Sequence, residues 1–303
     1  MTKTIDINQE TRYKLNNGLQ IPVIGFGVYD IPIEETEDLV YQALKDGYRH
    51  IDSAVGYGNQ AHAARGIRRF LDDTGVGRSS IWFTTKLTNA QQGLQEAQKA
   101  LEGIAADVKE AIGYVDLVLL HSPKTDSQRR LDSWKVLETA VLDPASSAIP
   151  VKSIGVSNFG IPHLQQLLAV ARVRPVLNQL ELHPWLPHVE LRDFLQKENI
   201  VAEAYSPLTQ GVKLQDPELL ALEAESGIPK GKLLLSWSFL QGFVVLVKSS
   251  KPERILTNLQ VLPKKGDSWK VELDDGIWHA LDKPDSHDVV TWGNQDPTLY
   301  PLD

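Results

Sequence analysis

Residues 81–121 read IWFTTKLTNAQQGLQEAQKALEGIAADVKEAIGYVDLVLLH, and this stretch decides the fold. It begins and ends with apolar runs, IWFTTKL (81–87) and VDLVLLH (115–121), which are typical of strands buried on both faces of a parallel sheet. Apolar residues between them recur at steps of three or four, as on one face of a helix: Leu94, Ala97, Leu101, Ile104, Val108 and Ile112. Gly113 stands where that helix should end. The stretch therefore predicts a strand, a helix and a second strand.

The same unit recurs along the chain. Further apolar runs are VIGFGV (23–28), RHIDSA (49–54), SIGVSNF (153–159), VLNQLEL (176–182), IVAEAYS (200–206) and FVVLVKS (243–249), which brings the predicted strands to eight. Helical spacing marks the segments 34–46, 59–71, 128–142, 162–171, 188–198, 216–226 and 229–241, with Gly47 at the end of the first. Eight alternations of strand and helix predict the α/β class and a (β/α)₈ TIM barrel.

The two ends of the chain lie outside this alternation. The turn sequence Asn16-Asn17-Gly18 predicts a small β-hairpin within residues 1–20. Residues 284–303 should form a C-terminal loop, and HSPKTDSQRR (121–130) a second, mobile loop at the rim of the barrel. Because no low-complexity linker interrupts the pattern, we expect a single domain over residues 1–303.

Composition limits the classes of partner. A net charge of −8 and a pI near 5.5 argue against nucleic acid or an anionic membrane as a partner. The chain has no cysteine, which excludes a disulfide, a thiol nucleophile and a thiolate metal site. The N-terminus lacks the apolar core of a signal peptide, and no apolar run approaches the length of a membrane span. We expect a cytoplasmic protein that is a monomer or a weak dimer.

Polar residues follow the predicted strands at the point where each ends. In such barrels, catalytic groups come from the carboxyl ends of the strands and the loops after them. The residues at these positions are Asp52, Tyr57, Lys86, His121, Ser157, Asn158, Gln179, Tyr205, Lys248 and Ser249. Taken singly, most have an ordinary explanation, such as turn chemistry for Asp52 beside glycines. Together they predict one site at the mouth of the barrel.

Lys86 is the most informative of these residues. It lies in a strand that should be buried, where lysine is rare unless it is paired, and Asp52 on the neighbouring strand is the available carboxylate. A lysine ammonium close to Tyr57 would lower the pKa of the phenol and make it a better proton donor. His121 could orient a carbonyl oxygen through a ring N–H. Since nothing here supplies a nucleophile, the set predicts reduction of a small-molecule carbonyl by a bound hydride donor.

Several stretches closely resemble the aldo-keto reductase family. They are GYRHIDSAVGYGNQ (47–60), IWFTTKL (81–87), VDLVLLHSP (115–123), SIGVSNF (153–159), LNQLELHPWLP (177–187), AYSPL (204–208) and VKSSKPERILTN (247–258). The LLHSP variant is similar to that of xylose and aldehyde reductases. The resemblance implies a barrel that binds NADP(H) in extended form without a Rossmann fold, and a catalytic tetrad of Asp52, Tyr57, Lys86 and His121. Tyr57 would be the general acid for reduction and the general base for alcohol oxidation.

The resemblance also implies a cofactor site. Ser157, Asn158 and Gln179 would bind the nicotinamide carboxamide, and Tyr205 would stack on the ring. Ser206 and Leu208 would approach the pyrophosphate. The adenosine 2′-phosphate would be bound by Lys248, Ser249, Ser250 and Arg254. Asn258 would lie near the adenine. The local chemistry agrees, since two cations with hydroxyls at a helix N-terminus suit a phosphate dianion.

Two departures from the family bear on the substrate. Many members carry tryptophan two residues after the catalytic lysine and directly after the catalytic histidine, where this chain has Thr88 and Ser122. We therefore expect a less aromatic and roomier pocket wall. Candidate substrate contacts are aromatic: Tyr29, Trp82, Trp185, Trp292 and Tyr300.

Two alternatives stay open. One is a barrel metallohydrolase, for which the candidate ligands are His50, Asp52, His121, His183 and His188. That alternative leaves Tyr57, Lys86 and the KSSKPER segment (248–254) unexplained, and we expect no metal. The other is a regulatory module of the same fold that binds NADP(H) with little turnover.

Overall fold

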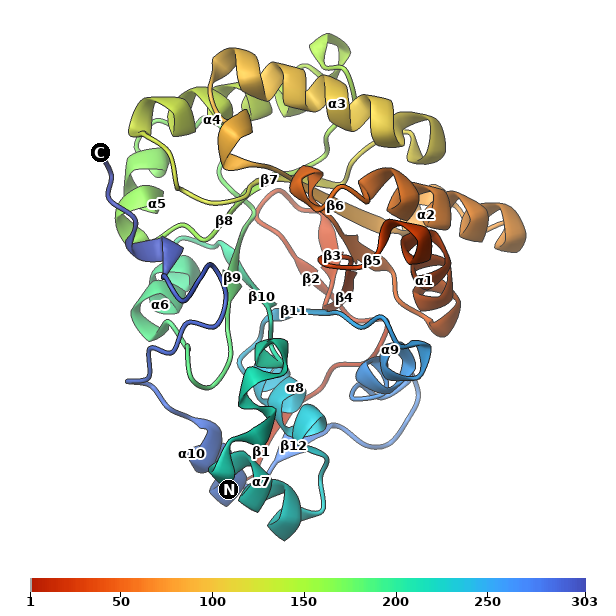
Figure 1. Ribbon diagram of the computed structural model, residues 1–303, viewed down its shortest axis with the longest axis vertical. Coiled ribbons are helices and arrows are strands. Elements are labelled where there is room, and N and C mark those ends of the chain that lie inside the picture. The colour runs from red at the N-terminus through yellow and green to blue at the C-terminus, as the bar shows by residue number, and fades with distance from the viewer. Residues whose placement is uncertain (1) are drawn as a thin grey trace.

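Eight parallel strands close into a barrel in the order β4-β5-β6-β7-β8-β9-β10-β11, and β11 pairs again with β4 (Figure 1). The computed structural model describes residues 2–303. Each barrel strand lies inside one of the predicted runs: β4 (Ile24–Gly27), β5 (His50–Asp52), β6 (Trp82–Leu87), β7 (Leu117–Leu120), β8 (Ile154–Ser157), β9 (Leu177–Glu181), β10 (Val201–Tyr205) and β11 (Val244–Val247). The predicted (β/α)₈ barrel is therefore confirmed.

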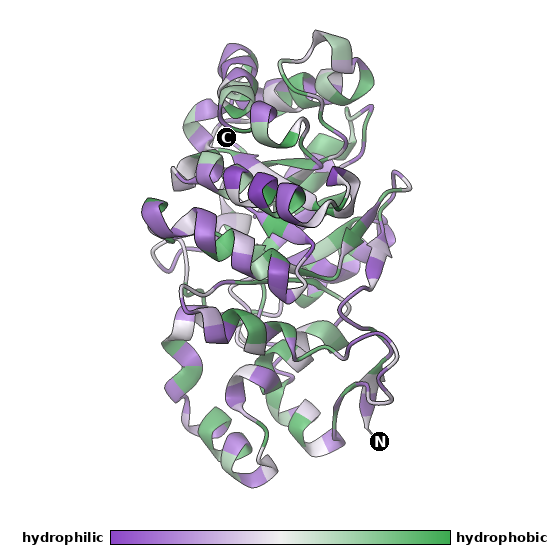
Figure 2. Cartoon of the chain, turned by 90° about the vertical axis from the view of Figure 1, so that its right-hand side faces the viewer, coloured by the Kyte–Doolittle hydropathy of each residue, from purple (hydrophilic) through white to green (hydrophobic). Residues whose placement is uncertain are grey.

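Helices follow the strands and surround the barrel (Figure 1). They are α1 (Ile33–Asp46), α2 (Gln60–Thr74), α3 (Leu94–Ile112), α4 (Ser127–Leu142), α5 (Ile161–Leu168), α6 (Val189–Lys197), α7 (Pro217–Ser226), α8 (Lys230–Leu240) and α9 (Pro252–Leu259). In Figure 2 the helices facing the viewer carry both hydrophilic and hydrophobic residues, as amphipathic helices must. Gly47 and Gly113 end α1 and α3 at positive φ, as predicted. Among residues 2–303 no helix is long and apolar enough to cross a membrane.

A hairpin covers the amino ends of the barrel strands. It consists of β2 (Arg12–Lys14) and β3 (Gln20–Pro22), in the region where the sequence predicted one. Leu15 and Ile21 of this hairpin pack on Trp82 and on neighbouring barrel residues. Trp82 thus lies at the closed end of the barrel, and its ring N–H donates to the Thr84 hydroxyl at 3.1 Å. Trp82 is buried and is not among the residues that line the cavity at the open end of the barrel, which contradicts its prediction as a substrate contact.

The C-terminal part of the chain runs back to the barrel. Two strands that were not predicted from the sequence, β1 (Lys3–Ile5) and β12 (Val271–Leu273), form an antiparallel pair. The helix α10 (Asp275–Leu281) follows β12. Irregular backbone then runs to a 3₁₀ turn at Pro297–Leu299, and Figure 1 shows this last segment beside α5. The rim loop is shorter than predicted. Asp126 caps α4 by accepting from the Arg129 N–H at 2.8 Å, so residues 127–130 are helix.

Candidate active site

A cavity of about 1140 Å³ opens at the carboxyl ends of the barrel strands. Asp52, Tyr57 and His121 line it, and Lys86 lies beneath them, fully buried. Every residue predicted to hold the cofactor lines the same cavity: Ser157, Asn158, Gln179, Tyr205, Ser206, Leu208, Lys248, Ser249, Ser250, Arg254 and Asn258. Residues from seven barrel strands and their loops therefore meet in one space, as the strand-end rule predicts.

The centre of the site is a buried ion pair. The Lys86 ammonium donates to both oxygens of Asp52, at 2.9 and 2.7 Å, and to the Ser53 carbonyl at 2.8 Å. It also lies 3.3 Å from the Tyr57 hydroxyl. A 3₁₀ turn, Val55–Tyr57, carries Tyr57 over the end of β5, and Gly58 ends that turn at a φ of 72°. This left-handed backbone conformation favours glycine, so Gly58 allows the chain to turn directly after Tyr57.

Burial and charge oppose each other at this centre. Burial is the largest single effect on Lys86 and acts to lower its pKa. The charge of Asp52, the neighbouring Tyr57 and the hydrogen bonds to both together outweigh burial, so the net pKa is raised. Burial also raises the pKa of Tyr57, and the Lys86 ammonium offsets only part of that rise. Lys86 therefore lowers the Tyr57 pKa as predicted, but burial, which the sequence does not show, outweighs this effect. Burial, with a contribution from Lys86, lowers the pKa of His121 to about 3, so its ring is neutral near pH 7.

Hydrogen bonds connect the residues predicted to bind the carboxamide. The Asn158 side-chain amide donates to the His121 carbonyl and to the Ser157 hydroxyl, both at 2.9 Å, and its oxygen accepts from the Tyr205 hydroxyl at 2.7 Å. Asn158 has a φ of 63°, a left-handed conformation that asparagine tolerates better than most residues. The side chains at the ends of β8 and β10 are thus held in one arrangement with His121.

Glu203 is a site residue that the sequence analysis missed. The Gln179 amide donates to Asp52 Oδ1 at 2.9 Å and to Glu203 Oε2 at 2.8 Å, which links a second buried carboxyl to the ion pair. Burial and the Asp52 charge raise the pKa of Glu203 to about 8, while burial lowers the pKa of His50 to about 3. The 3.8 Å contact between His50 and Glu203 therefore joins two neutral groups near pH 7. A charged residue inside the apolar run 200–206 was the available signal, as it was for Lys86.

The far end of the cavity is cationic. Lys248, Ser249 and Ser250 follow β11, and Arg254 lies in the first turn of α9. Among residues 2–303, neither Lys248 nor Arg254 forms an ion pair with a carboxylate, so their charges are available to a ligand. Two unpaired cations, two hydroxyls and a helix N-terminus suit a phosphate dianion.

Comparison with known proteins identifies the family. The model of the aldo/keto reductase family matches residues 23–273. The chain belongs to this family. An uncharacterized oxidoreductase of Saccharomyces cerevisiae is 38% identical over 284 residues, 92% of this chain and 96% of that protein. An aldo-keto reductase of Mycolicibacterium smegmatis is 38% identical over 250 residues, 82% of this chain and 87% of that protein.

Solved structures agree with this assignment. The crystal structure of an aldo/keto reductase from Brucella melitensis has a TM-score of 0.78 and 35% identity, covering 92% of this chain and 99% of that one. The Bombyx mori aldo-keto reductase, solved in complex with NADP, has a TM-score of 0.78 and 26% identity, covering 90% of this chain and 92% of that one. The family and the named oxidoreductases support carbonyl reduction as the general reaction.

The aromatic residues around this aldo-keto reductase site divide into two groups. Tyr29 and Trp292 line the cavity, whereas Trp185 and Tyr300 do not. Trp185 is buried in the core, and its carbonyl accepts from the Asp288 N–H at 2.7 Å, so it supports the C-terminal segment instead of contacting substrate.

Thr88 and Ser122, the two departures from the family pattern, form hydrogen bonds in and between the loops that carry them. The Thr88 side chain caps a short turn with Gln91, and the Ser122 hydroxyl donates to Asn89 Oδ1 at 2.7 Å. Neither residue lines the cavity, but the wall is still aromatic, because Trp292 reaches His121 from the C-terminal segment with ring centroids 5.7 Å apart.

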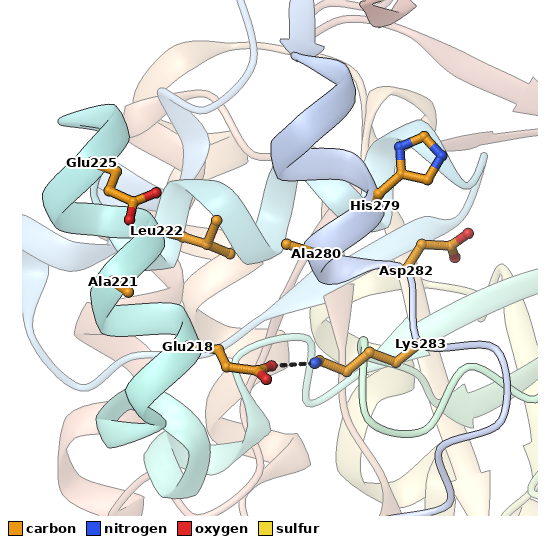
Figure 3. A pocket seen from close by; sticks show the side chains of 8 residues that line it. All are labelled: Glu218, Ala221, Leu222, Glu225, His279, Ala280, Asp282 and Lys283. Atoms are coloured by element: carbon orange, nitrogen blue, oxygen red, sulfur yellow. Dashed lines mark hydrogen bonds and ion pairs between the residues drawn. The ribbon is translucent and has the colours of Figure 1, made fainter.

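Over residues 2–303, the rest of the surface carries no second site. Among residues 2–303, no three His, Cys, Asp or Glu side chains are placed to hold a metal ion. A second hollow of about 430 Å³ lies between α7 and α10, and Figure 3 shows Lys283 reaching across it to pair with Glu218. Its acidic residues are on exposed helix surfaces, so we assign it no chemistry.

Glu203 gives a pH-dependent prediction. Because its pKa is near 4.3 in the unfolded chain and about 8 in the folded protein, its contribution to stability is full below about pH 4.3 and is lost as the pH rises towards 8. Glu203→Gln removes this dependence, so the melting temperature of the variant should rise relative to wild type between about pH 5 and about pH 8.5. Differential scanning calorimetry measures the difference. Glu272→Gln, on the exposed side of β12, is the control, and a wild-type-minus-Glu203→Gln difference that is constant with pH would contradict the assignment.

Proposed function

We propose that this aldo-keto reductase uses NADPH to reduce an aldehyde or ketone to the alcohol, reversibly, with Tyr57 as the proton donor. The observation that carries the proposal is the contact of a cavity-lining phenol with a fully buried ammonium that Asp52 holds in place. An ion pair kept at that depth costs desolvation energy, and a structural role alone would not require a phenol beside it.

The residues divide the work at the substrate carbonyl. Tyr57 is protonated near neutral pH, as any phenol with an ordinary or raised pKa is, and so it is in the form that can donate. Lys86 stabilises the phenolate as the proton leaves, and Asp52 keeps the ammonium in position. A neutral His121 ring, in edge contact with Tyr57 at 5.7 Å between centroids, donates an N–H to the carbonyl oxygen.

The cavity suits NADPH along its whole length. The bound cofactor would supply a hydride to the carbonyl carbon. Ser157, Asn158 and Gln179 would hold the carboxamide, Tyr205 the face of the ring, and Ser206 and Leu208 the pyrophosphate. Gln179 uses both N–H groups on buried carboxyls and so presents its carbonyl oxygen as the acceptor. Lys248, Ser249, Ser250 and Arg254 would hold the 2′-phosphate, and Asn258 the adenine.

Other features stay predictions of the sequence. They are the cytoplasmic location, the absence of nucleic-acid, membrane and metal partners, the monomeric or weakly dimeric state, and the single domain over residues 1–303. The alternative of a regulatory NADP(H)-binding module without useful turnover is favoured by no observation, and the first experiment below separates it from the enzyme.

Tyr57→Phe tests the acid. The variant should bind NADPH as wild type does, because the hydroxyl lies at the substrate side, but its carbonyl reduction should fall about 10²- to 10⁴-fold. NADPH binding is followed by quenching of protein fluorescence, and turnover by NADPH oxidation with a panel of aldehydes and ketones. Near-normal turnover in Tyr57→Phe would contradict the acid assignment, and no turnover by wild type on a broad panel would favour the regulatory module.

Replacing Lys248 or Arg254 by Met tests the 2′-phosphate site. Each substitution should weaken the binding of NADPH by about 1.5–3 kcal/mol, the range for a hydrogen bond to a charged group. The binding of NADH should be almost unchanged. Dissociation constants for both cofactors come from the same fluorescence titration. Lys264→Met, at an exposed cation outside the cavity, is the comparison variant. Equal losses for NADPH and NADH would reject the phosphate role.

A further inference from the structure

The C-terminal segment is tied to the barrel by one buried carboxylate. Glu181 is the last residue of β9, and only 3% of its surface is exposed. Its oxygens accept from the Val290 N–H at 2.8 Å, the Thr291 N–H at 3.1 Å, the Thr291 hydroxyl and the His183 ring at 2.9 Å. Three of these four donors belong to the C-terminal segment, so the carboxylate works mainly as an anchor for that segment.

The anchored residues come directly before Trp292. Its backbone has a φ of 50°, which is uncommon for a bulky residue and persists only where neighbouring contacts enforce it. The ring N–H donates to the Tyr205 hydroxyl at 3.0 Å, and the Lys124 ammonium lies 5.6 Å from the ring centroid. Trp292 is therefore held at two points, through the Glu181 anchor on its backbone side and through Tyr205 at its ring.

The position of Trp292 decides the shape of the pocket above Tyr57. Its ring meets His121 edge to face, His121 meets Tyr57 in the same way, and Tyr29 lies 5.1 Å from Tyr57 between centroids. The space where a carbonyl would approach Tyr57 is thus bordered by aromatic rings. Aromatic surfaces of this kind contact planar or bulky apolar groups well.

We propose that Glu181 is a positioning residue that holds Trp292 as the wall of the substrate pocket and thereby gives the enzyme a preference for carbonyl compounds with an aromatic substituent. The proposal rests on the proposed function and adds to it the substrate class and the residue that determines it. Glu181 does not itself line the cavity, so its effect on substrate must pass through Val290, Thr291 and Trp292. Loss of the carboxylate leaves the barrel strands in place and releases the segment that carries Trp292.

Two substrates and two disruptions test the preference. The quantity measured is the ratio of kcat/KM for benzaldehyde to kcat/KM for propanal, which does not depend on the fraction of enzyme that is folded. Glu181→Gln replaces an acceptor by an amide that cannot accept from all four donors, and Thr291→Val removes one donor from the segment itself. Both should lower the ratio, Glu181→Gln by about tenfold, the scale of a lost apolar contact in a pocket.

Two variants serve as controls. Thr291→Ser keeps the hydroxyl and should restore the ratio lost in Thr291→Val. Glu190→Gln makes the same chemical change on the exposed face of α6 and should leave the ratio as in wild type.

A double-mutant cycle shows whether Glu181 acts through Trp292. Trp292→Leu should lower the ratio to a value that the further change Glu181→Gln does not alter, because the positioned ring is already gone. An unchanged ratio in Glu181→Gln, or a further fall in the double variant, would overturn the proposal.

Amide hydrogen exchange tests the Glu181 anchor without any measurement of activity. The amides of Val290 and Thr291 donate to Glu181, so peptides that contain them should exchange faster in Glu181→Gln than in wild type or Glu190→Gln. Unchanged exchange there would overturn the anchor regardless of activity. Failure of the wild type to reduce benzaldehyde, with turnover of other carbonyl compounds, would contradict the substrate class alone. Failure on the whole aldehyde and ketone panel would contradict the proposed function, while the exchange result would still decide the anchor.

Discussion

The ion pair of Lys86 with Asp52 is the interaction on which the rest of the site depends. Lys86 has no access to solvent, and Asp52 is its partner through both carboxylate oxygens. Removing one member of such a pair leaves an uncompensated buried charge, which typically costs about 3–5 kcal/mol. The pair joins β5 to β6, places a positive charge next to Tyr57, and holds Gln179 through a third hydrogen bond, which Asp52 Oδ1 accepts. The proposed proton donor and the proposed cofactor contact Gln179 therefore share one electrostatic centre.

The mouth of the barrel combines a rigid part and an added part. Strand ends supply the proposed catalytic groups, and hydrogen bonds among Asn158, Tyr205 and His121 keep these residues in one arrangement. The C-terminal segment adds the aromatic wall, and its attachment runs through Glu181 at the end of a strand. Loops placed on a rigid scaffold commonly carry specificity, so this division would let the substrate class vary while the proposed proton donor, Tyr57, stays fixed.

The barrel can be predicted from the sequence, and so can the proximity of Asp52, Lys86, Tyr57 and His121, for physical reasons. Strands buried on both faces are apolar throughout, and a lysine inside one demands a carboxylate on a neighbour. Trp82 shows where this reasoning fails, because residues 82 and 86 point to the same side of β6 but lie roughly 13 Å apart along it, at opposite ends of the barrel. Glu181 was not recognised as an anchor, since its partner Thr291 is 110 residues away in the chain. The effect of burial on the pKa of Tyr57 could not be predicted from the sequence either, because burial depends on the assembled fold.

The most direct test of this account is a single turnover of benzaldehyde with NADPH carrying deuterium at the transferable C4 position, compared between wild type and Lys86→Met. The account predicts benzyl alcohol with one deuterium on the carbinol carbon in wild type. It also predicts a rate at least about 10²-fold lower in Lys86→Met, with Tyr57 still present, because the phenolate loses its stabilising charge. Alcohol without deuterium, or a Lys86→Met rate within a few-fold of wild type, would contradict it.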